Sequence, residues 1–128
     1  MKEAVIVSAA RTPIGRAFRG AFNNLEAPSM TAQAINAAVE RAGVDPAEID
    51  DCIIGAAMQQ GTQTMNLGRQ AVMAAGLPVT VSGMTVDRQC SSGLMAISIG
   101  ANNITNDGSQ VIVAGGCKSV SLIQNEHF

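Results

Sequence analysis

The stretch Val86-Asp87-Arg88-Gln89-Cys90-Ser91-Ser92-Gly93-Leu94 decides the fold, because a short apolar run ends there and a long helical pattern begins. Serine suits the first turn of a helix, and residues 94–104 supply the small and apolar side chains of a packed helix. Cys90 therefore opens the predicted helix, where unpaired N–H groups and the helix dipole favour thiolate over thiol. Because thiolate is the nucleophilic form of cysteine, this junction is the first candidate for chemistry.

Apolar runs outside this junction predict the rest of a sheet. Residues 84–86 form the strand that leads to Cys90, and the runs at 4–7, 52–58 and 111–114 predict three more buried strands. Continuous runs of this kind are typical of strands covered on both faces, so we expect the run at 4–7 to lie in the middle of the sheet.

Helical patterns alternate with these strands. Residues 30–42, 66–73 and 90–106 are predicted helices, and 45–50 form a helical turn. The fold class is therefore α/β, a mostly parallel sheet of βαβαβαβ order with helices on both faces, within one domain that spans residues 1–128. Functional groups gather at the carboxyl ends of strands in such sheets, which is where Cys90 falls.

Composition excludes several classes of function. Aromatic residues make up 2% of the chain and the net charge is −2, so neither stacking surfaces nor a basic stripe for nucleic acid is present. The first apolar run is too short for a signal peptide or a membrane span, and we expect neither a membrane nor a nucleic-acid partner. Three widely spaced cysteines favour a reducing, cytoplasmic setting.

The other candidate side chains carry weaker arguments for function. Cys52 is expected to be a core residue and Cys117 a structural cysteine at a strand end, while His127 is expected to be an exposed terminal histidine. No ligand set with metal spacing and no phosphate-binding glycine motif occurs, so we predict no metal site. The arginines in residues 8–24 are either solvated or paired with carboxylates at a boundary. For Cys90, the residues alone leave a nucleophile and a structural cysteine equally open.

Four segments carry a resemblance to a known family: residues 7–15, 66–70, 88–94 and 114–116 with Ser119. Together they resemble the thiolase family, specifically the amino-terminal part of acetyl-CoA acetyltransferases and 3-ketoacyl-CoA thiolases. The resemblance implies that Cys90 attacks an acyl-CoA thioester and becomes acylated, with coenzyme A thioesters as substrates and no bound cofactor. The sequence departs from the family pattern at Asp87, where asparagine is common, and at Lys118, where glutamate is usual.

Family members are much longer, so the resemblance implies that residues 1–128 are an incomplete thiolase-like N-terminal domain without the loop domain and C-terminal half. The family's histidine, asparagine-glutamate and second-cysteine motifs have no counterpart, and the unpatterned tail at 118–128 is typical of a chain cut short. We expect little turnover from the isolated chain, and a homo-oligomer paired near residues 84–86 or a complementing chain. A non-catalytic interaction module and a ketoacyl-synthase-like condensing enzyme are the alternatives.

Overall fold

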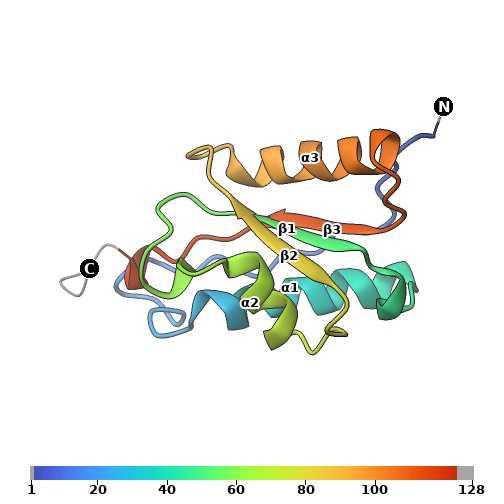
Figure 1. Ribbon diagram of the computed structural model, residues 1–128. Coiled ribbons are helices and arrows are strands. Elements are labelled where there is room, and N and C mark those ends of the chain that lie inside the picture. Colours follow the sequence, from blue (N-terminus) through green and yellow to red (C-terminus); the bar gives the residue numbers. More distant parts are fainter. Residues whose placement is uncertain (1, 124–128) are drawn as a thin grey trace.

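A three-stranded parallel sheet forms the centre of the fold, and the computed structural model describes residues 2–123 (Figure 1). The strands are β1 (Asp51–Gly55), β2 (Ser82–Val86) and β3 (Ile112–Gly116), in the spatial order β2-β1-β3. Asp51 of β1 pairs with Ser82 on one side and with Ile112 on the other. All three strands therefore end at the same edge of the sheet, as predicted for a parallel α/β fold.

Helices cover both faces of this sheet, which confirms the predicted fold class. Helix α3 (Ser92–Asn106) lies on one face, and α1 (Ala27–Ala42) and α2 (Leu67–Ala74) lie on the other (Figure 1). Three short 3-10 helices complete the described elements: η1 (Pro46–Glu48), η2 (Gly61–Gln63) and η3 (Val120–Leu122). Within residues 2–123, no helix has the length and apolar character needed to cross a membrane.

The core forms between β1 and the α1–α2 layer. Cys52 and Ile54 of the central strand are almost fully buried, and they belong to one cluster with Ile35 of α1 and Val72 of α2. Helix α1 ends as its sequence predicts, because Gly43 adopts a left-handed φ of 67° that the helix cannot continue. The amphipathic helices therefore bury their apolar stripes against the strand that the topology places in the middle.

The predicted strand at residues 4–7 is not part of the sheet. Val5, Ile6 and Val7 are 70%, 78% and 72% exposed, and this segment forms no ladder within residues 2–123. Consecutive side chains of an extended chain point to opposite sides, so exposure of all three shows that neither side is covered. A β-branched run predicts only extended backbone, whereas a strand also needs a distant partner, so β1 rather than this segment is central.

The motif at residues 66–70 has a structural role in joining α2 to β2. Asn66 caps the helix by accepting from the Arg69 N–H at 3.3 Å, and its amide donates to the Gly83 carbonyl at 2.9 Å. Gly68 lies so close to the strand that an added Cβ would come within 2.2 Å of the Met84 oxygen. The motif thus fixes the helix that precedes the strand leading to Cys90.

Candidate active site

A tight turn connects the end of β2 to the start of α3. Gln89 has a left-handed φ of 50°, and its N–H donates to the Asp87 carboxylate at 2.8 Å. The Ser92 hydroxyl accepts from the Arg88 N–H at 2.7 Å and donates to the Gln89 carbonyl at 2.6 Å. A non-glycine residue held at positive φ by surrounding hydrogen bonds is typical of strained turns at functional sites.

Cys90 lies on this turn and its side chain is exposed. The helix begins at Ser92 with Ser91 as its N-cap, so the predicted helix start at Cys90 is two residues early. The left-handed backbone of Gln89 and the φ of −97° at Ser91 keep the chain out of helical geometry until Ser92. Cys90 is therefore presented just ahead of the helix, on a strand-to-helix elbow of the kind that displays nucleophiles in α/β enzymes.

Glycines allow the start of α3 to rest directly on the ends of two strands. A Cβ added at Gly55, the last residue of β1, would lie 2.1 Å from the backbone carbon and oxygen of Ser92. A Cβ added at Gly116, the last residue of β3, would lie 3.1 Å from the Cα of Gly93. Gly116 thus lets the backbone of α3 approach the end of β3 closely.

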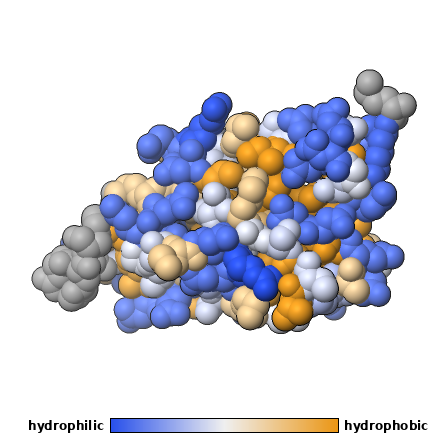
Figure 2. All heavy atoms as spheres, in the orientation of Figure 1, coloured by the Kyte–Doolittle hydropathy of each residue, from blue (hydrophilic) through white to orange (hydrophobic). Residues whose placement is uncertain are grey.

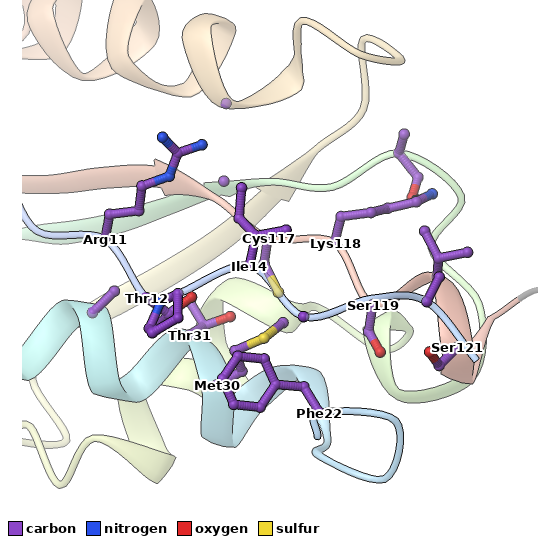
Figure 3. Close-up of a pocket in the computed structure, with 18 of the residues that line it drawn as sticks. Arg11, Thr12, Ile14, Phe22, Met30, Thr31, Cys117, Lys118, Ser119 and Ser121 are labelled. Carbon is purple, nitrogen blue, oxygen red and sulfur yellow. Dashed lines mark hydrogen bonds between the residues drawn. The ribbon is translucent and has the colours of Figure 1, made fainter. Parts of the chain in front are cut away.

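A cavity of about 700 Å³ opens beside the Cys90 turn (Figure 3). Its walls come from four segments: the connection at residues 10–17, the start of α1, the strand ends at Gly55 and Gly116, and residues 117–121. Cys90 and Cys117 both line it. The sequence predicts Cys90 at the carboxyl end of a strand. The structure shows in addition that residues 10–17, which follow the apolar run at 4–7, form another wall of the cavity.

The three cysteines differ sharply in their surroundings. Cys52 is fully buried in the sheet, and burial, with a smaller contribution from the Asp51 carboxylate, raises the pKa of its thiol to about 12. Cys117 is partly covered, with its Sγ 3.9 Å from the Ala27 carbonyl oxygen, and burial raises its pKa as well. The prediction that Cys52 is a core residue is confirmed, and Cys90 is the exposed thiol of the three.

Gln63 is a buried residue of the site that the sequence did not single out. Its amide nitrogen donates to the carbonyls of Ala57 and Met58 at 3.1 and 3.3 Å, and its oxygen accepts from the Ser119 N–H. The side chain is fully buried and joins the loop after β1 to the loop after β3. A single buried amide in a polar loop has no periodic signal from which its role could be predicted.

The two departures from the family pattern take part in local hydrogen bonds. Asp87 accepts from Gln89 as described, and the Lys118 ammonium donates to the Ala57 carbonyl at 3.2 Å. His127 lies outside the described residues. Among residues 2–123, no group of three or more metal-ligating side chains gathers.

The sequence matches the family described as "Thiolase, N-terminal domain" over residues 4–127. The chain is 42% identical to a 3-ketoacyl-CoA thiolase of Bacillus subtilis, with 96% of this chain and 32% of the relative covered. It is also 42% identical to an acetyl-CoA acetyltransferase of Cupriavidus necator, with 94% and 30% covered. Its fold matches the crystal structure of the Bacillus anthracis acetyl-CoA acetyltransferase with a TM-score of 0.88 and 42% identity, over 94% of this chain and 30% of that one.

These matches show that the chain shares both sequence and fold with thiolases. The chain belongs to the thiolase family, in which it corresponds to the N-terminal domain. It spans about a third of the length of the curated relatives it matches.

Proposed function

We propose that Cys90 is the acyl-accepting nucleophile of a thiolase-type acyltransferase. Its thiolate would attack the carbonyl carbon of an acyl-CoA thioester, forming the new carbon–sulfur bond while coenzyme A leaves as a thiolate that takes up a proton. The acyl-CoA is the substrate, and the step needs no resident cofactor. The exposed position of Cys90 beside the cavity, in a chain of this family, is the observation that carries the proposal.

We propose further that the chain alone stops after this first step. Its one histidine is His127, outside the described residues, and no aspartate or glutamate lines the described cavity, so no general base stands beside Cys90 there. Nucleophile, base and oxyanion donors act as a unit, and loss of any member removes most of the rate. Turnover by residues 1–128 would therefore need catalytic groups from outside this segment, in a compartment such as the cytoplasm that keeps Cys90 reduced.

Mass spectrometry of the chain after incubation with acetyl-CoA tests the nucleophile. We expect one acetyl group on the peptide that carries Cys90, and none in the Cys90→Ala variant. Cys117→Ala is the matched control, because it removes the other cavity thiol and leaves Cys90 in place. Acetylation that persists in Cys90→Ala would contradict the assignment, and rapid cleavage of acetoacetyl-CoA by the chain alone would contradict the second proposal.

A second candidate function is supported by exposed apolar surface. Val5, Ile6 and Val7 are uncovered, and hydrophobic residues also show between α3 and α2 over the edge strand β2 (Figure 2). Leu94 on α3 adds to this surface with 72% of its side chain exposed. An interaction module would use such surface to bind another protein. Stoichiometric binding unchanged in Cys90→Ala, together with no acetylation of the native chain, would favour the module over the enzyme.

A further inference from the structure

We propose that the Cys90 cavity selects acyl thioesters whose acyl chain ends in a carboxylate, and that Lys118 is the main selecting residue. The inference rests on the proposed acyl transfer to Cys90 and adds the class of acyl group. It also gives a role to Lys118, whose charge is opposite to that of the glutamate usual in the family.

Within residues 2–123, the charged residues of the cavity wall are all basic. Arg11, Arg16 and Lys118 line it, and no aspartate or glutamate of this described part does, although the chain carries more acidic than basic residues, 10 against 8. Within residues 2–123, no carboxylate forms an ion pair with any of the three. Uncompensated charge of one sign along a concave wall raises the local concentration of ions of the other sign. The cavity therefore favours an anionic ligand.

Lys118 is anchored at the wall and still has donors to spare. Its ammonium makes one hydrogen bond, to the Ala57 carbonyl at 3.2 Å, and an ammonium has three N–H donors. Figure 3 shows Arg11 and Lys118 among the side chains that line the cavity, on either side of Cys117 in this view. A carboxylate that entered the cavity could accept from Lys118 without breaking its bond to Ala57.

The position of the nucleophile decides which part of the substrate meets these charges. The thioester carbonyl must reach the Cys90 sulfur, and Cys90 lines the same cavity as Lys118. The phosphates of coenzyme A lie at the far end of the long pantetheine arm from that carbonyl, whereas the end of a short acyl chain lies only a few bonds away. Cations that line the same cavity as the thiol are therefore better placed for a carboxylate on the acyl group than for the phosphates.

Alkylation of Cys90 measures the charge selection without any substrate. Iodoacetate and iodoacetamide react by the same displacement of iodide by the thiolate, and differ in the charge of the reagent. We expect the iodoacetate-to-iodoacetamide rate ratio to fall about threefold in Lys118→Met and about tenfold in Lys118→Glu at low salt. Arg19→Met is the control, because it removes one positive charge from the same connection at a residue that does not line the cavity. A ratio unchanged in both Lys118 variants would overturn the inference.

Acyl transfer to Cys90 identifies the source of the anion. We would compare adipyl with hexanoyl thioesters, which have equal chain length and differ in the terminal carboxylate, on coenzyme A and on N-acetylcysteamine, which lacks phosphates. We expect Lys118→Glu to lower the adipyl-to-hexanoyl rate ratio on both carriers. If Lys118→Glu changed only the rate ratio between the two carriers, Lys118 would act on the phosphates of coenzyme A. That result would overturn the inference. Failure of Cys90 to accept any acyl group, with its alkylation ratio still dependent on Lys118, would count against the proposed function instead.

Discussion

Gly55 and Ser92 lie in direct backbone contact, so close that a Cβ at residue 55 would come within 2.1 Å of the Ser92 carbonyl. This contact sets how near the start of α3 can approach the sheet. The close approach in turn allows the Cys90 turn to line the cavity.

The Gly55→Ala variant should destabilise the fold by about 3 kcal/mol, because neither backbone segment can move aside without shifting a strand or a helix. Gly115→Ala is the matched control on the neighbouring strand, since an added Cβ there meets no atom within 4 Å. We expect that control to change stability by less than about 0.5 kcal/mol. Urea unfolding of both variants measures the difference, and equal losses would refute the contact as a steric limit.

The Gln63→Leu variant should cost about 3 kcal/mol of stability, because it leaves the Ser119 N–H and the Ala57 carbonyl with fewer partners in a buried place. It should also loosen the loops on both sides of the cavity. Gln60→Leu, at an exposed residue of the same loop, serves as the control. Hydrogen exchange of the Ser119 amide reports the local effect, and protection retained in Gln63→Leu would show that the bridge is not needed.

Alkaline unfolding should depend on Cys52. The pKa of its thiol is raised from 9.0 to about 12 by burial, so its contribution is fully present below pH 9 and is lost as the pH rises through the folded value. The difference between these values corresponds to roughly 4 kcal/mol at most. We expect stability to fall from pH 9 to pH 10.5 in the native chain and to fall less in Cys52→Ala. Denaturant titrations of both chains at each pH measure the two slopes, and equal slopes would contradict the expectation.

Acid unfolding should depend on Asp50, which joins the start of β1 to the chain before β3. The N–H groups of Gln110 and Val111 donate to its carboxylate at 2.6 and 3.2 Å, and these bonds lower its pKa. A lowered pKa gives stability that is present above the unfolded value and lost as the pH falls through the folded one.

Asp50→Asn should therefore be less stable than the native chain at pH 7, by no more than about 1 kcal/mol because the carboxylate is exposed. The difference should close as the pH falls below the ordinary pKa of 3.8 and through the lower folded value. Glu48→Gln, which removes a nearby exposed carboxylate without such bonds, should show no gap in thermal melts at either pH. A gap for Asp50→Asn that persists in acid would show that its charge is not responsible.

Local patterns in the sequence were sufficient to predict the amphipathic helices and the strands that pack against them. The helix predicted over 30–42 is Ala27–Ala42, and the short apolar run at 84–86 is the end of β2. The run at 4–7 is more apolar than β2 yet lies outside the sheet, because its place depends on pairing with residues far away in the chain.

The candidate site also has features that the sequence predicts and features that it does not. Cys90 could be singled out because serine and glycine after a strand mark a helix start. Gln63 and the basic lining of the cavity could not be found, because each depends on which loops meet at the sheet edge. Hydrogen-bond partners and the sign of charge around a cavity belong to the folded chain rather than to any one segment of it.

The exposure of Cys90 also has a consequence for the lifetime of anything attached to it. The adjoining cavity of about 700 Å³ has room for at least roughly twenty water molecules. Closed active sites protect reactive intermediates from hydrolysis by excluding water, and the described walls leave this thiol exposed. An acyl group on Cys90 would thus decay as a thioester does in bulk water, with hydrolysis competing against every slower transfer.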